Sequence, residues 1–146
     1  MSRLRAFLGW SPDDRRLWLT ALLFGGTARL GLCLLPVRRV RGVLRRLAGL
    51  AASRLPPRAT PGRVVWAVAS ASRYVPRATC LVRALAAEAL LIGQGYPVRL
   101  CIGVTREGEN GLGAHAWVED AATSAVVDQT DRAGYERILA FEGPGS

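Results

Sequence analysis

The hydrophobic period of this chain changes once, past the middle of the sequence, and this change limits the fold class. In the first part, apolar residues recur every three or four positions, as they do on one face of a helix. From Val98 to Val104 they alternate with Arg99, Cys101 and Gly103, which is typical of a strand. Helices that precede the strands favour an α+β domain with a small antiparallel sheet.

Start and stop signals place the helices. Ser11-Pro12 and Thr60-Pro61 are N-cap pairs, and Thr79 or Cys80 opens a further apolar run. We expect helices over about 12–35, with a possible break at Gly25-Gly26, and over 37–50, 62–73 and 80–93. Residues 1–54 then form a helical N-terminal region, 55–62 (LPPRATPG) a linker and 63–146 the core, together as one compact domain.

Two short strands after the first one predict a hairpin. Residues 114–119 and 125–128 read as strands, residues 107–113 as a loop, and 135–141 as a last helix or strand. If Glu119 pairs with Ser124, antiparallel register places His115 opposite Asp128 on the same face. A slip by one residue would put these two side chains on opposite faces.

The charge is strongly positive. The chain has 146 residues and a formal net charge of +9, and its basic residues are all Arg. An anionic partner would account for this charge, and so would GC-rich codon usage. No zinc-finger spacing and no ribonucleoprotein motif is present, so we expect no nucleic acid partner. The Arg-rich side of the 37–50 helix is expected to be solvated, with docking of an acidic protein as the alternative.

The stretch from Leu17 to Pro36 is apolar and about as long as a membrane span. Arg29 lies within it beside several glycines, and it comes too late for an ordinary signal peptide. We therefore expect a buried helix, and membrane association, on the surface or as a span, stays an alternative.

The three cysteines are Cys33, Cys80 and Cys101. Their odd number and irregular spacing do not form a disulfide framework, which favours a reducing cytoplasm. With one histidine, they also lack the spacing of metal ligands, so no metal or other cofactor is expected. Cys33 and Cys101 are expected to pack in the core.

Cys80, His115 and Asp128 follow one another in the order that a thiol-dependent acyl-transfer or peptidase site needs. A helix N-terminus and a nearby imidazolium both stabilise a thiolate. A carboxylate opposite the imidazole would fix its tautomer and leave its other nitrogen for the thiol. Each residue alone also has a structural explanation, because buried cysteines, core histidines and turn aspartates are common.

Two segments carry a family resemblance. HAWVED followed by VVDQT resembles the His and Asp strands of transglutaminase-like cysteine enzymes. PRATCLVRALAAEALLIGQGYPVRLCIGV resembles the lasso-peptide biosynthesis leader peptidases in their stand-alone form. The resemblance implies a papain-like core in which Cys80 is the nucleophile, His115 the general base and then acid, and Asp128 the residue that orients His115.

The resemblance also implies partners: a precursor peptide with a leader segment, a separate small leader-recognition protein and an asparagine-synthetase-like macrolactam cyclase. A transglutaminase-like acyltransferase and a non-enzymatic scaffold that binds a peptide or a membrane stay open as alternatives. The chain shows no upstream Gln for the oxyanion hole, and Trp66, Tyr74 and Arg77 are candidates for the second donor. Trp117 is expected to share a strand face with His115.

Overall fold

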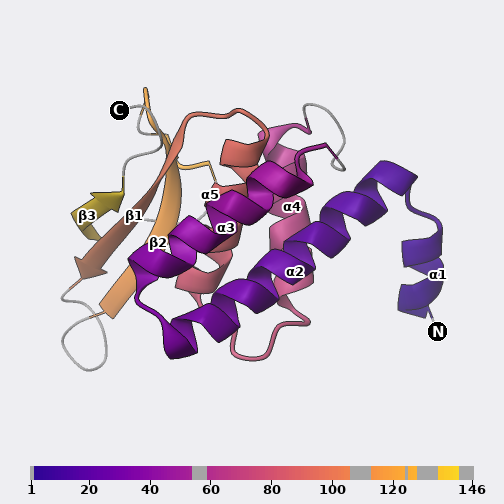
Figure 1. Cartoon of the computed structure of the whole chain (residues 1–146), viewed down its shortest axis with the longest axis horizontal. Helices are drawn as coiled ribbons and strands as arrows, with labels where there is room; N and C mark the ends of the chain where they lie inside the picture. The colour runs from indigo at the N-terminus through magenta and orange to yellow at the C-terminus, as the bar shows by residue number, and fades with distance from the viewer. Residues whose placement is uncertain (1, 54–58, 106–112, 124, 128–134, 142–146) are drawn as a thin grey trace.

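The computed structural model describes residues 2–53, 59–105, 113–123, 125–127 and 135–141. In these ranges the elements are α1 (Ser2–Leu8), α2 (Pro12–Leu34), α3 (Val37–Ala51), α4 (Pro61–Ser72), α5 (Cys80–Gly93), β1 (Val98–Thr105), β2 (Gly113–Asp120) and β3 (Glu136–Phe141). The strands form an antiparallel sheet in the order β2-β1-β3, and the helices lie to one side of it (Figure 1). The predicted α+β class is confirmed.

The helix starts follow their capping residues. The side chains of Ser11, Thr60 and Thr79 each accept a hydrogen bond from a backbone N–H three residues later, which pairs one of the free donors of a helix end. The predicted break in α2 is wrong, because the helix continues through Gly25 and Gly26. Phe24, Gly25 and Ala28 are buried there. This burial outweighs the helix penalty of about 1 kcal/mol that each glycine carries.

One hydrophobic core joins the helices to the sheet. It contains buried side chains from α2 to α5 and from the helix-facing side of β1 and β2; representative members are Leu17, Leu44, Val64, Leu85, Leu100 and Val118. The short helix α1 was not predicted, although Gly9 directly follows its last residue and donates to the carbonyls of Arg5 and Ala6. It is held by an edge-to-face contact between Phe7 and Trp18 of α2.

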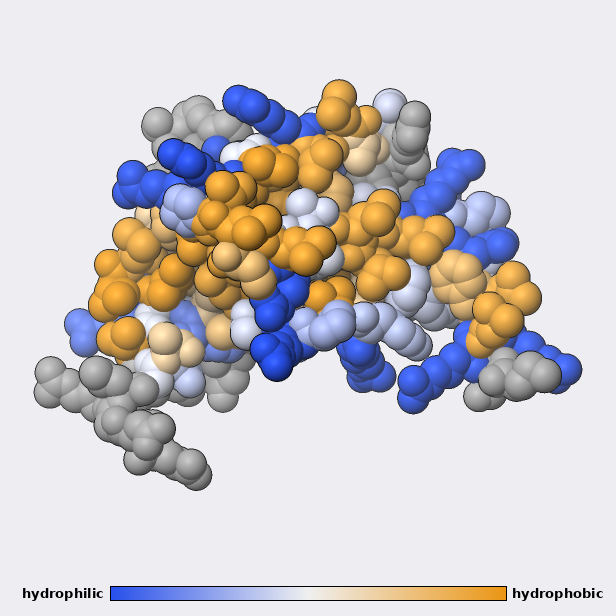
Figure 2. Space-filling view, turned by 60° about the horizontal axis from the view of Figure 1, so that its bottom comes forward, coloured by the Kyte–Doolittle hydropathy of each residue, from blue (hydrophilic) through white to orange (hydrophobic). Residues whose placement is uncertain are grey.

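By length and composition α2 could cross a membrane, although a core helix passes the same test. One side of it is in the core, through residues such as Leu17 and Phe24. The opposite side exposes Leu23, Leu30 and Leu34 by 69%, 70% and 83%. Figure 2 shows apolar side chains gathered on one face of the molecule. The expectation of a buried helix therefore holds for only one face of α2.

Arg41 departs from the solvated face that was expected for α3. It is nearly buried, and its guanidinium binds both carboxylate oxygens of Glu88 in α5, with Nε at 2.8 and 2.9 Å. The same guanidinium donates to the carbonyl of Phe141 at 3.1 Å and lies over its ring. Desolvation raises the pKa of Glu88, while the bonds from Arg41 oppose this rise. Arg41 thus ties α3 to α5 and β3.

The predicted hairpin register after β2 is wrong by two residues. Glu119 bridges Val126 instead of Ser124, and the bridge is isolated. The cause is a turn at Asp120, whose carboxylate accepts bonds from the N–H groups of Ala122 and Thr123 at 2.9 Å each. Asp128 lies outside the described residues. The last predicted element, left open as helix or strand, is the strand β3.

Candidate active site

Cys80 is the first residue of α5, and its thiol is half-buried. The preceding Thr79 caps the helix: its hydroxyl accepts from the N–H of Val82 at 3.4 Å, and its carbonyl accepts from Arg83 at 3.1 Å. For the N–H groups of Cys80 and Leu81, the described part of the chain shows no acceptor. These donors and the positive end of the helix dipole favour a thiolate and can bind a developing oxyanion.

His115 lies near the start of β2, at the end of the sheet beside which α5 begins with Cys80. Residues 94–97 connect α5 to β1, which therefore runs back along the helix. The helix is about 21 Å long at 1.5 Å per residue. The stretch of β1 from Val98 to Gly103 is about 17 Å long at the usual strand rise. Gly103 is the register partner of His115 in β2, so the imidazole strand begins where the helix begins.

The His115 ring lies on the sheet face that points away from the helices. Strand alternation puts Ala116 in the core with α5, whereas His115 stacks near Trp117, with ring centroids 6.3 Å apart. The imidazole also contacts the Tyr135 ring, with ring centroids 5.2 Å apart. The shared face with Trp117 is therefore confirmed. Both residues lie at this end of the sheet, and among the described residues no hydrogen bond joins the Cys80 thiol to the imidazole.

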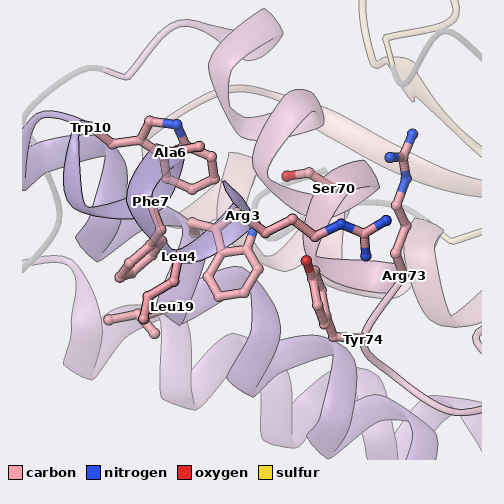
Figure 3. Close-up of a pocket in the computed structure, with 10 residues that line it drawn as sticks. Arg3, Leu4, Ala6, Phe7, Trp10, Leu19, Ser70, Arg73 and Tyr74 are labelled. Carbon is pink, nitrogen blue, oxygen red and sulfur yellow. The ribbon is translucent and has the colours of Figure 1, made fainter. Parts of the chain in front are cut away.

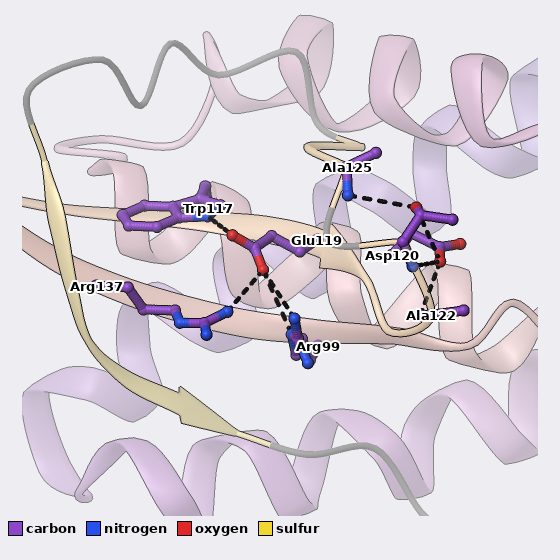
Figure 4. A network of polar contacts seen from close by, with 8 residues as sticks. Arg99, Trp117, Glu119, Asp120, Ala122, Ala125 and Arg137 are labelled. Carbon is purple, nitrogen blue, oxygen red and sulfur yellow. Dashed lines mark hydrogen bonds and ion pairs between the residues drawn. The ribbon is translucent and has the colours of Figure 1, made fainter.

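The buried carboxylate of Glu119, which the sequence analysis missed, holds the Trp117 ring that packs beside His115. Glu119 accepts from the indole N–H of Trp117 at 2.8 Å, from Arg99 of β1 at 3.2 Å and from Arg137 of β3 at 3.0 Å (Figure 4). Desolvation would raise the pKa of Glu119, but the bonds from Trp117 and Arg99 outweigh it and the net shift is downward. One side chain thus links all three strands. Alternation gave the signal, since it places Trp117 and Glu119 on one face.

Trp117 also packs directly on the backbone of β1. A Cβ atom on Gly103 would lie 2.5 Å from Cη2 and 2.7 Å from Cζ3 of the indole. Only a residue without a side chain leaves room for this contact. The position of Trp117, and with it the surface on which His115 rests, therefore depends on Gly103.

The other two cysteines have different surroundings. Cys101 is buried as predicted, and burial, with the neighbouring Glu119 carboxylate, raises the pKa of its thiol to about 11. A neutral thiol at ordinary pH is a poor nucleophile. The prediction that Cys33 packs in the core is wrong, because this residue is exposed at the end of α2. Arg29 donates a hydrogen bond to its sulfur at 2.7 Å.

The candidates for a second oxyanion donor are dispersed. Trp66 packs edge-on against Trp10, with centroids 5.0 Å apart, and Tyr74 packs against Trp18 at 5.5 Å. Arg77 lies in the segment that leads to Cys80 and has a positive φ of 54°. Within the ranges that the structure describes, no cluster of three or more His, Cys, Asp or Glu residues could hold a metal ion.

Comparison with known proteins assigns the chain to a family. Residues 27–140 match the Transglutaminase-like superfamily, a range that contains Cys80, His115 and Asp128. No curated protein and no solved structure matches the sequence. Members of this superfamily are typically cysteine proteases or acyltransferases. Because the match covers most of the sequence, the chain belongs to the transglutaminase-like superfamily.

Proposed function

We propose that this chain is a cysteine peptidase that removes the leader from a ribosomally made precursor peptide in lasso-peptide biosynthesis. The observation that carries the proposal is the position of Cys80 at the start of α5, beside two backbone N–H groups without an acceptor in the described residues. The resemblance of the segment around Cys80 to stand-alone leader peptidases supports the choice of substrate.

In the proposed reaction, the Cys80 thiolate attacks the carbonyl carbon of the last leader peptide bond. The oxyanion that forms accepts bonds from the free N–H groups of Cys80 and Leu81. His115 takes the thiol proton and gives it to the leaving amine of the core peptide, while Asp128 orients the imidazole. Water then hydrolyses the acyl-enzyme and releases the leader.

Because the His115 ring lies on the sheet face that points away from α5, this mechanism requires the imidazole to turn toward the thiol at the end of the sheet where α5 and β2 begin. Alkylation of Cys80 by iodoacetamide tests whether the two groups meet. At neutral pH, we expect Cys80 to be alkylated faster in the parent than in His115→Ala, because a nearby imidazole stabilises the reactive thiolate. An identical rate of Cys80 alkylation in both proteins would contradict a Cys80–His115 pair.

Product analysis tests the activity itself. The purified chain is incubated with a candidate precursor peptide and a leader-recognition protein, and the products are weighed by mass spectrometry. Free leader and free core peptide are expected; a covalent adduct with an amine would instead favour acyl transfer. Cys80→Ala should abolish turnover, and Cys33→Ala, at an exposed thiol elsewhere, should leave it intact. Cleavage by Cys80→Ala at the wild-type rate would refute the nucleophile assignment.

A further inference from the structure

A hollow of about 520 Å³ opens between α1, the first turns of α2 and the end of α4 (Figure 3). Its walls include the rings of Phe7, Trp10, Trp18 and Tyr74. Phe7 and Trp10 each contact Trp18 edge to face, with centroids 5.5 and 6.1 Å apart. Pockets of this size that are lined by aromatic side chains can take a large apolar side chain.

Two cations border the same hollow. Figure 3 shows the guanidinium groups of Arg3 and Arg73 on one side of it, near Ser70 and Tyr74. Neither arginine has a carboxylate partner among the described residues. Asp14, in the first turn of α2, forms an ion pair with Arg63 instead. Two like charges beside one hollow repel each other, and a bound carboxylate would relieve this repulsion.

The hollow also lies close to Cys80 along the chain. Tyr74 in its wall precedes Cys80 by a short segment, which spans at most about 20 Å even when fully extended. An extended peptide of about six residues covers the same distance. A peptide held in the hollow would therefore need about six residues or fewer to reach the thiol.

We propose that this hollow binds a segment of the peptide substrate in which an acidic residue neighbours a large apolar one, about six residues or fewer from the cleaved bond. This proposal rests on the proposed peptidase function. The apolar side chain packs among the rings, and the carboxylate pairs with Arg3 and Arg73. Arg3 and the rings of Phe7, Trp10 and Trp18 precede the matched family range 27–140, whereas Arg73 and Tyr74 lie within it, so the hollow joins the family domain to the helices before it.

The probe for binding is a displayed library of random twelve-residue peptides, captured by the intact but inactive Cys80→Ala chain. We expect enrichment of Asp or Glu beside Trp, Phe or Leu. A synthetic peptide of the enriched sequence should bind Arg73→Glu and Arg3→Glu at least tenfold more weakly, and Arg39→Glu, an exposed arginine on α3, as the parent does. No acidic–apolar consensus, or equal affinity for Arg73→Glu, would overturn the site.

A kinetic comparison separates this proposal from the proposed function. With the precursor peptide as substrate, Arg73→Glu should raise KM about tenfold with little change in kcat, and its melting temperature should match the parent's. If the parent cleaves the precursor and Arg73→Glu has the same KM, the hollow is not a substrate site, but the proposed peptidase function is not contradicted. No cleavage by the parent, despite binding that Arg73→Glu weakens, would refute the peptidase and the substrate role together.

Discussion

Gly103→Ala should destabilise the fold through a single contact. The added Cβ would lie 2.5 and 2.7 Å from two indole carbons of Trp117 and 2.9 Å from the carbonyl oxygen of Glu136. Carbon atoms pack best at about 3.5–4.0 Å, so the indole or β3 must shift by roughly 1 Å. Such overpacking costs about 1–3 kcal/mol. Since Gly103 has no positive φ, this cost comes from packing and not from backbone strain.

Thermal denaturation measures the effect. For a chain near this length, the cost corresponds to a melting temperature lower by roughly 3–10 °C. Gly42→Ala is the matched control: no atom lies within 4 Å of its added Cβ. Alanine in this helix should stabilise by about 1 kcal/mol. The proposed peptidase activity should also fall in Gly103→Ala, because Trp117 packs beside the His115 ring.

A double-mutant comparison gives the refuting result. Trp117→Phe places a smaller ring over Gly103, so the alanine should cost less in that background than in the parent. A cost of Gly103→Ala that is the same in both backgrounds would show that the indole contact is not its source. A Gly103→Ala protein as stable as the parent would refute the reasoning altogether.

Three further predictions concern the cap and two titrating groups. Thr79→Ala should lower the unfolding free energy by about 1 kcal/mol and lower kcat, because it loosens the helix end that holds Cys80; urea denaturation and product analysis check both. The raised pKa of Cys101, about 11, means that stability falls by about 1.4 kcal/mol per pH unit as the pH rises from 9 towards 11, and Cys101→Ala should flatten this slope. The lowered pKa of Glu119 contributes stability that is present above its unfolded pKa of about 4.3 and is lost as the pH falls through the folded value. Below pH 5, the unfolding free energy of Glu119→Gln should therefore fall less steeply with decreasing pH than that of the parent. An equally steep fall would contradict this role of Glu119.

Local signals predicted the parts of the fold that depend on neighbouring residues. The cap at Thr79 and the alternation after Val98 placed α5 and β1 close to their observed bounds. Alternation also placed His115 and Trp117 on one face. These features follow from backbone geometry within one element, which the sequence specifies directly.

Features that depend on distant residues were not predictable in the same way. Alternation gives the faces of a strand but not its partner, so the pairing of His115 with Gly103 of β1 was not anticipated. The exposure of Cys33 depends on which side of α2 meets the core, and α2 is apolar on both sides. The role of Asp128 stays a prediction, since this residue lies outside the described ranges.

The Glu119 cluster has a consequence for how the chain matures. Arg137 in β3, the last described strand, donates to this carboxylate, whereas Arg99 and Trp117 come earlier in the chain. During synthesis, the earlier residues leave the ribosome first, and Glu119 has one cation fewer until β3 has followed them. The support beneath His115 therefore stays incomplete until β3 has joined the sheet, so β3 is required before the proposed site can take its final form.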